Sequence, residues 1–130
     1  MHNRRPAAPY ADFVKEVSAE LLESVDIALA ASIARDKIII DPGIGFGGKS
    51  VEQNLACIKH VSDFAMLGYP VLIGASNKSF IGQALGGAAI SERLAGTLAA
   101  NIIAIKNGAS IIRVHDVKAH RDALDVMFAL

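Results

Sequence analysis

The sequence contains little cysteine and few aromatic residues. It has one cysteine and no tryptophan, and aromatic residues make up 5% of its 130 positions. The single cysteine, Cys57, cannot form an internal disulfide, which excludes the small disulfide-stabilised folds. No signal-peptide pattern opens the sequence. Both observations lead us to expect a reducing environment, the cytoplasm.

The sequence also lacks an excess of charge of either sign. Its 13 Lys and Arg residues are balanced by 13 Asp and Glu residues, so the formal net charge at pH 7 is zero. This balance disfavours nucleic-acid binding through a strongly basic surface. Hydrophobic residues make up 52% of the chain, and so apolar a chain without net charge is expected to fold rather than remain disordered.

No hydrophobic run is long enough to cross a bilayer. The longest strongly apolar stretch without charged residues, Leu94–Ile105, is much shorter than the roughly 20 residues of a transmembrane helix. We therefore expect no membrane partner. The hydrophobic residues are mostly aliphatic, which suits parallel strands covered by helices. No linker interrupts them, so we predict a single domain over residues 1–130.

Hydrophobic periodicity predicts one helix followed by three strand–helix pairs. We expect helices at residues 10–34, 51–67, 91–107 and 118–128, strands at residues 37–41, 70–74 and 109–114, and a long glycine-containing loop after the second strand. The apolar helix 91–107 is expected to lie between layers, and His60 and His120 at the surface. Alternating strands and helices form right-handed βαβ units around a parallel sheet, either open and doubly wound or part of a (β/α)8 barrel. In both architectures, ligands bind at the carboxyl ends of the strands.

Polar residues gather at the ends of these predicted strands. Asp41 ends the first, Lys78 follows the second within Ser76-Asn-Lys-Ser79, and Arg113 and His115 lie on the third. Because strand side chains alternate between faces, Arg113 and His115 point to the same side. Taken singly, each could be a solvated strand-end residue. Together they predict one site with a cationic majority, which suits an anionic substrate or leaving group such as phosphate.

The glycine-rich segment Gly43–Ser50 is ambiguous. It satisfies the phosphate-binding pattern G-x-x-x-x-G-K-[ST], and its glycines also satisfy the dinucleotide-binding pattern G-x-G-x-x-G. Against the first, Asp41-Pro42 precedes the loop and no later strand has a clear Walker-B pattern. Against the second, no strand-end acid lies about 20 residues further on. We interpret the segment as a tight turn beside a ligand, with Phe46 as a mobile apolar flap.

Four segments, in order and spacing, resemble dihydropteroate synthase of folate biosynthesis: Asp41-Pro-Gly-Ile-Gly-Phe-Gly47, Gly74–Gly82, Ser91–Thr97 and Ile112–Val117. Met1–Arg4 is also similar to the end of that family's fifth barrel strand. The resemblance covers essentially the whole chain and implies a (β/α)8 TIM barrel. Because such a barrel takes roughly 250 residues, the chain is expected to be a partial barrel, its carboxyl-terminal half, with about three to four βα units and a parallel sheet.

The resemblance implies a transferase that condenses 6-hydroxymethyl-7,8-dihydropterin diphosphate with p-aminobenzoate to give 7,8-dihydropteroate and pyrophosphate. Carried over motif by motif, the resemblance implies that the pterin is bound by Asp41, Lys78 and Arg113. It implies that the diphosphate is bound by Arg113 and His115, and p-aminobenzoate by Phe46 and Ser79. No side chain acts as a nucleophile, because the attacking amine belongs to the substrate. Lys78, Arg113 and His115 would support departure of the leaving group.

The resemblance also implies Mg²⁺, with its ligands in the missing amino-terminal half and none in this chain, and a homo-oligomer, typically a dimer. Asn77 departs from the arginine usual in the family, which puts local anion contacts in doubt. With half a site, we expect the isolated chain to be inactive or weakly active. Two alternatives stay open: a pterin-binding methyltransferase domain of the folate–cobalamin kind, and a non-catalytic half-barrel assembly module.

Overall fold

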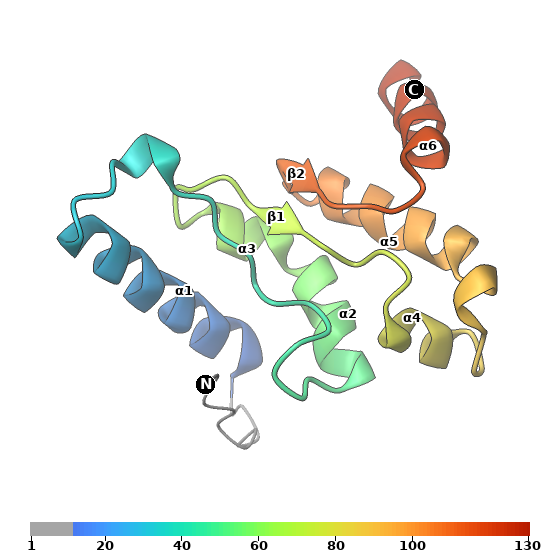
Figure 1. The fold of residues 1–130 in the computed structure, drawn as a ribbon, viewed down its shortest axis with the longest axis horizontal. Coiled ribbons are helices and arrows are strands. Elements are labelled where there is room, and N and C mark those ends of the chain that lie inside the picture. The colour runs from blue at the N-terminus through green and yellow to red at the C-terminus, as the bar shows by residue number, and fades with distance from the viewer. Residues whose placement is uncertain (1–11) are drawn as a thin grey trace.

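The computed structural model describes residues 12–130, and three short parallel segments lie at the centre of the molecule (Figure 1). The elements in chain order are α1 (Phe13–Ala30), the 3-10 helix η1 (Arg35–Lys37), α2 (Val51–Lys59), α3 (Val61–Ala65), β1 (Leu72–Ile73), α4 (Ser79–Ala84), the 3-10 helix η2 (Ile90–Glu92), α5 (Leu94–Lys106), β2 (Ile111–Ile112) and α6 (Val117–Ala129). β1 pairs with β2 in parallel, Leu72 opposite Ile111, and Ile40 forms a parallel bridge with Val71. The predicted α/β fold with a parallel sheet is confirmed. The first ten residues, including the segment compared with a fifth barrel strand, lie outside the described residues.

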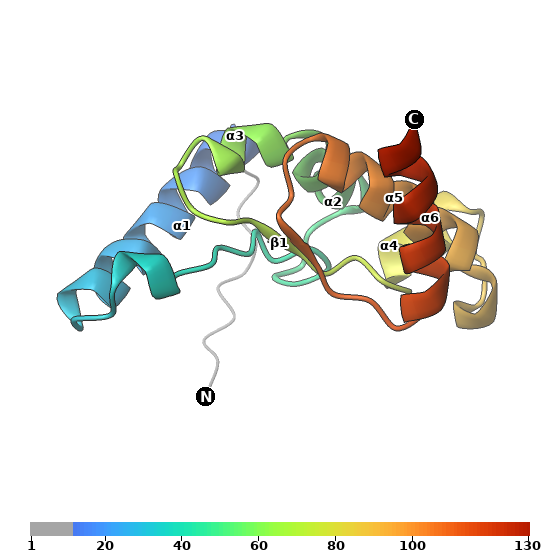
Figure 2. The same cartoon turned by 90° about the horizontal axis from the view of Figure 1, so that it is seen from above.

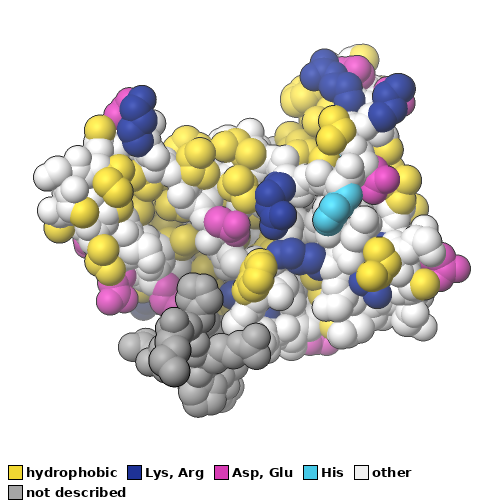
Figure 3. All heavy atoms as spheres, viewed as in Figure 1, with side chains coloured by type: hydrophobic (Ala, Val, Ile, Leu, Met, Phe, Trp, Pro, Cys, Tyr) yellow, Lys and Arg dark blue, Asp and Glu magenta, His cyan; other side chains and the backbone are white. Residues whose placement is uncertain are grey.

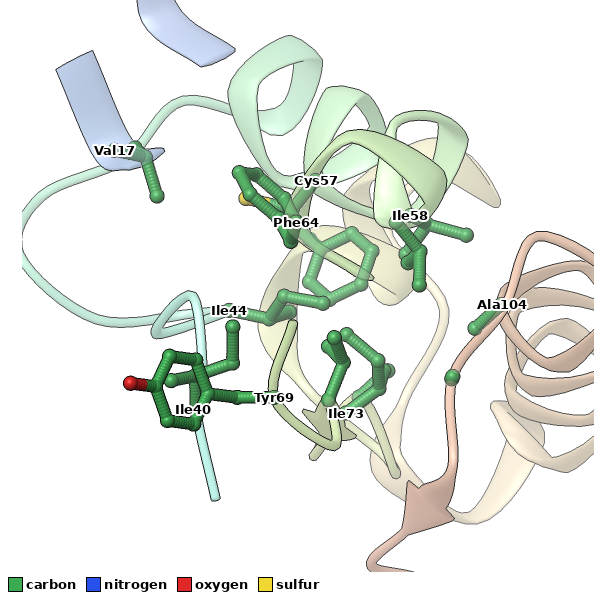
Figure 4. Packing of buried hydrophobic residues seen from close by; sticks show 14 of the residues in the cluster. Val17, Ile40, Ile44, Cys57, Ile58, Phe64, Tyr69, Ile73 and Ala104 are labelled. Atoms are coloured by element: carbon green, nitrogen blue, oxygen red, sulfur yellow. The ribbon is translucent and has the colours of Figure 1, made fainter. Parts of the chain in front are cut away.

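In the described part of the chain, helices cover only one face of these strands. Helices α2, α3 and α5 lie on the same side of the strands (Figure 2). On that side Ile73 is fully buried and Ile40 is 4% exposed, and Figure 4 shows both in the buried cluster that contains Phe64. Ile39, which points the other way, is 51% exposed. The short apolar run at residues 38–40 predicts a buried strand. This prediction is wrong at Ile39, because no helix of the described chain covers its face.

The strands are also shorter than the sequence predicts. Residues 37–41 contribute a single bridge at Ile40, and the 3-10 helix η1 covers Arg35–Lys37. The Arg35 guanidinium lies 4.2 Å from the Tyr69 ring centroid, and its Nη1 donates a hydrogen bond to the Tyr69 hydroxyl at 2.6 Å. This tertiary contact holds η1 against Tyr69, just before the central segment of the sheet (residues 71–76, which contain β1). The hydrophobic periodicity of residues 37–41 gives no sign of such a contact.

The helix predicted at residues 51–67 is two helices. Its start is local in origin: the Ser50 hydroxyl accepts a hydrogen bond from the Gln53 N–H, and the Gln53 Oε1 accepts one from the Ser50 N–H, forming a capping box. The break falls at His60, which ends α2 and begins α3. The Asn107 side chain, distant in sequence, donates hydrogen bonds to the carbonyls of Ile58 (3.0 Å) and Lys59 (3.2 Å). These bonds satisfy carbonyls at the helix end.

A short helix, α4, occupies the segment predicted to be a loop. Its residues Phe80 and Ile81 are 2% and 4% exposed, so packing rather than local propensity stabilises it. Helix α5 begins at Leu94 instead of residue 91, because η2 precedes it. The expectation that this helix lies between layers is not met at Ile103, which is 48% exposed. Within residues 12–130, no helix is long and apolar enough to span a bilayer.

His120 was expected at the surface, but it is 3% exposed and joins α6 to α5. Its Nε2 lies 2.8 Å from Nδ2 of Asn101, and its Nδ1 lies 2.8 Å from the Asp116 carbonyl oxygen. The surface prediction failed because a buried hydrogen-bond partner on another helix compensates the cost of burying the ring. His60 remains partly exposed beside Asp63.

We expect Phe64→Ala to destabilise the fold by about 3–5 kcal/mol, because it removes a fully buried aromatic side chain and leaves a cavity. Phe64 is 0% exposed, whereas nearby Met66 is 84% exposed. Met66→Ala is therefore the control and should change the unfolding free energy by less than about 0.5 kcal/mol. Urea unfolding followed by circular dichroism measures both. Equal changes in unfolding free energy for the two variants would contradict the placement of Phe64 in the core.

Candidate active site

The register of the parallel strands brings the predicted site residues together. The pairing of Ile73 with Ile112 continues beyond the strands, since the Arg113 N–H donates to the Ile73 carbonyl at 3.0 Å. Continuing the same register places Ser76 beside His115, and their side chains are hydrogen-bonded at 2.8 Å. Basic side chains, an acidic side chain and a histidine lie close together near the middle of this face (Figure 3). The carboxyl ends of the strands thus form the candidate site.

Asp41 begins the glycine-rich loop. Its Oδ1 accepts a hydrogen bond from the Gly43 N–H at 2.8 Å. Gly43 and Gly45 have φ values of 73° and 75°, which L-residues with a side chain rarely adopt. Asp41 is exposed and has no salt bridge among the described residues. Its carboxylate is therefore oriented by the turn and accessible to a ligand.

Lys78 reaches back under this loop. Its Nζ donates a hydrogen bond to the Ile44 carbonyl and lies 4.3 Å from the Phe46 ring centroid. A Cβ at position 45 would lie 2.5 Å from the Lys78 Cδ, so glycine at that position allows the lysine to pass. Burial, foremost, lowers the pKa of Lys78; the positive charges of Arg113 and Lys49 lower it further, and Asp41 opposes them. These four charges interact within one site.

Arg113 and His115 each have a specific neighbour on the central segment. A Cβ at Gly74 would lie 3.0 Å from the Arg113 Nη2, so the absence of a side chain leaves room for the guanidinium. His115 is held by Ser76, whose Oγ lies 2.8 Å from the ring Nδ1 and accepts from the His115 backbone N–H at 3.2 Å. Arg113 and His115 are otherwise exposed, and both are accessible to a ligand.

The two residues predicted to contact p-aminobenzoate lie beside Lys78. Phe46 is 64% exposed with its ring near the Lys78 ammonium group. Ser79 is the exposed first residue of α4. Both residues are therefore accessible, and the mobility of Phe46 stays a prediction.

Lys49 and Asn54, which are not among the site residues predicted from the sequence, hold the backbone of the glycine-rich loop. Lys49 Nζ donates to the carbonyls of Gly43 (3.2 Å) and Phe46 (3.4 Å). Asn54 is 2% exposed, accepts from the Gly45 N–H at 2.6 Å, and donates to the carbonyls of Lys49 and Ser50. A signal was present for Asn54, because it shares the buried helix face of Cys57 and Ile58 at helical spacing.

Asn77 has a backbone role. Its φ is 58°, a left-handed conformation in which asparagine is enriched among non-glycine residues. Its N–H donates to Thr97 Oγ1 at 3.1 Å, and its carbonyl accepts from Arg93 Nη1 at 2.9 Å. Asparagine at this position therefore supports the turn between β1 and α4.

The described residues do not form a metal site by themselves. Within residues 12–130, no three His, Cys, Asp or Glu side chains are grouped closely enough to hold a metal ion. These residues therefore do not supply a set of Mg²⁺ ligands without donors from elsewhere.

Comparison with known proteins identifies the family to which these residues belong. The family model described as "Pterin binding enzyme" matches residues 1–115. The chain belongs to the pterin-binding enzyme family. It is 46% identical over 123 residues to a dihydropteroate synthase of Neisseria meningitidis, covering 93% of this chain but 43% of that protein. It is also 40% identical over 117 residues to a Mycobacterium tuberculosis protein named inactive dihydropteroate synthase 2, covering 90% of this chain and 36% of that protein.

Solved structures of the family have the same fold over this region. The chain is similar to Xanthomonas albilineans dihydropteroate synthase with 4-aminobenzoic acid, with a TM-score of 0.91 and 41% identity over 99% of this chain and 46% of that one. The complex of that enzyme with 7,8-dihydropteroate gives a TM-score of 0.90 and 42% identity, covering 96% and 49% of the two chains. This pterin-binding family member thus spans less than half the length of the relatives it matches.

Cys57 is excluded as a nucleophile of the candidate site. It is 0% exposed in α2, and burial raises the pKa of its thiol from 9.0 to about 11; the charge of Lys49 opposes the shift and that of Asp41 adds to it. Because the fold favours the neutral thiol, this contribution to stability is complete below pH 9 and is lost as the pH rises through about 11.

We expect Cys57 to react with a thiol reagent at pH 8 at least roughly 100-fold more slowly in the folded chain than in urea, because thiolate is scarcer and the sulfur is inaccessible. Absorbance of the released thiolate of a disulfide reagent measures the rate. Rapid reaction of the native chain, with circular dichroism unchanged, would contradict the buried position.

Proposed function

We propose that this chain is the carboxyl-terminal half of a dihydropteroate synthase, in which Asp41, Lys78, Arg113 and His115 form one part of the active site. The observation that carries the proposal is the convergence of these groups at the carboxyl ends of adjacent parallel strands in a member of the pterin-binding family. Ligands bind at this end of the strands in (β/α)8 barrels.

A partial TIM barrel explains the uncovered face of the strands. Ile40 and Ile73 face the helices, whereas Ile39 is 51% exposed on the opposite side. In a closed barrel that opposite side is the packed interior, lined by bulky branched residues. Each of the three parallel segments is followed by a helix, in agreement with three βα units. We propose that residues 1–130 form a single domain that needs further strands to close.

The pterin ring would bind between Asp41 and Lys78. A carboxylate accepts hydrogen bonds and suits the amino group and ring N–H of a pterin, whereas an ammonium group donates and suits its carbonyl and ring nitrogen. Lys78 is already bonded to the Ile44 carbonyl, so the ligand would share this ammonium group with the loop. The planar Arg113 guanidinium can stack on the ring.

The same residues fit the chemistry of leaving-group departure. The p-aminobenzoate nitrogen forms a bond to the pterin methylene carbon, the carbon–oxygen bond to the diphosphate breaks with its electron pair, and the amine loses a proton. Charge develops on the departing pyrophosphate, where Arg113, His115 and Lys78 supply positive charge or N–H donors. Phe46 and Ser79 lie on the side where p-aminobenzoate would approach. The chain provides positioning and charge rather than a nucleophile.

Other parts of the complete protein follow as proposals. Mg²⁺ would take its ligands from the half that this chain lacks. A homodimer and a cytoplasmic location stay predictions. The non-catalytic assembly module is favoured by one observation, the half-exposed Ile39 on the uncovered strand face, because exposed apolar surface promotes association. Light scattering tests it, and a monodisperse monomer would contradict association of this chain.

We expect Asp41→Asn to weaken binding of 6-hydroxymethyl-7,8-dihydropterin diphosphate about 10- to 100-fold, because a charged acceptor is lost while the acceptor oxygen for Gly43 is retained. Asp36→Asn is the control, since that exposed carboxylate is paired with Lys37. Calorimetry measures the affinity of both variants for the pterin diphosphate. It is carried out with the chain alone and with the chain mixed with the amino-terminal half of the Neisseria meningitidis relative. Equal affinities for the two variants would contradict the pterin role. Tighter binding of methyltetrahydrofolate would favour the methyltransferase alternative.

We expect the 130-residue chain to release little or no pyrophosphate by itself, because the remaining strands and loops of the site are absent. Addition of the same amino-terminal half should raise the rate if the halves associate. An enzyme-coupled pyrophosphate assay, with each half alone as control, measures this. Turnover by the chain alone at the rate of a full-length relative would contradict the half-site proposal.

A further inference from the structure

Ser76 and His115 make a two-point contact at the carboxyl end of the sheet. Ser76 Oγ lies 2.8 Å from Nδ1 of the His115 ring and accepts a hydrogen bond from the His115 backbone N–H at 3.2 Å. The two residues are 39 positions apart, the same offset that separates the paired residues of β1 and β2. The contact therefore follows from the strand register, not from a chance approach of two surface side chains.

The positions of the hydrogen atoms in this contact follow from the number of donors and acceptors available. Ser76 is 6% exposed, and among the described residues its hydroxyl has no hydrogen-bond partner besides His115. The backbone N–H occupies one lone pair of Oγ. The hydroxyl hydrogen then needs an acceptor, because a buried unpaired donor costs about 1–3 kcal/mol. Nδ1 of a neutral ring is such an acceptor, and a ring that accepts at Nδ1 carries its hydrogen on Nε2.

We propose that Ser76 is a positioning residue that holds neutral His115 as the Nε2–H tautomer, so that the exposed ring offers a donor to diphosphate oxygens. The choice of ligand rests on the function proposed above. Deprotonated phosphate oxygens only accept hydrogen bonds, so a ring with a bare Nε2 would repel them. Ser76 thus decides whether neutral His115 attracts or repels the leaving group.

The pairing of Ser76 with His115 has a counterpart one step earlier in the register. Gly74 lies opposite Arg113 and makes room for its guanidinium. Ser76 lies opposite His115 and bonds its ring. Because alternate residues of a strand share a face, the central segment presents Gly74 and Ser76 to the two cationic side chains in turn. The segment therefore makes room for one proposed diphosphate ligand and forms a hydrogen bond with the other.

Nitrogen-15 NMR of ring-labelled histidine tests the tautomer directly in the free 130-residue chain, at a pH where the ring is neutral. We expect Nε2 protonated and Nδ1 bare, with the Nδ1 resonance shifted by the serine hydroxyl bond. Ser76→Ala should lose that shift, Ser76→Thr should restore it, and Ser110→Ala, at an exposed position before β2, should leave it unchanged. A protonated Nδ1 in the unmodified chain, or a spectrum unaffected by Ser76→Ala, would overturn the proposal.

A double-mutant cycle with inorganic pyrophosphate separates positioning from a direct or purely structural role. We expect Ser76→Ala to weaken pyrophosphate binding about 3- to 10-fold in the unmodified chain and to have no effect in the His115→Ala background. Equal losses in both backgrounds would overturn action through His115. If the chain with its complementing half binds no pyrophosphate, the proposed function fails at this site, while the NMR result still decides the tautomer.

Discussion

Parallel pairing of β1 with β2 is the constraint on which the candidate site depends. The offset that sets Ile73 opposite Ile112 also sets Gly74 beside Arg113 and Ser76 beside His115. A slip of one residue would turn both cationic side chains toward the helix layer. The hydrophobic pairing that stabilises the sheet therefore also specifies the arrangement of the charged groups, and the packing of the core and the chemistry of the site are not independent.

The second constraint is the glycine-rich loop, which links the first strand to α2. Its left-handed glycines direct carbonyl oxygens toward two lysines, so that Lys49 and Lys78 are bonded to the loop from two sides. Asn54, buried in α2, fixes the loop from a third direction. The backbone of a segment without regular secondary structure is thus held by the side chains of Lys78 and Asn54, which lie outside it.

Much of the site could be predicted from the sequence because it depends on position along strands. Asp41, Lys78, Arg113 and His115 were found at strand ends, and the structure brings them together there. The supporting residues were not all found. Lys49 belongs to an ambiguous glycine pattern, and Asn54 belongs to no motif. Neither is predicted as a site residue, because both act through contacts with the loop backbone that no sequence periodicity encodes.

Local patterns along the chain account for the alternation of strands with helices, the start of α2 at its capping box, and the motif residues that match the pterin-binding family. Tertiary structure decided the rest. The break at His60 depends on Asn107, the burial of His120 depends on Asn101, and α4 depends on the burial of Phe80. The exposure of Ile39 has the same kind of cause, because whether a strand face is covered depends on elements far away in the chain or outside it.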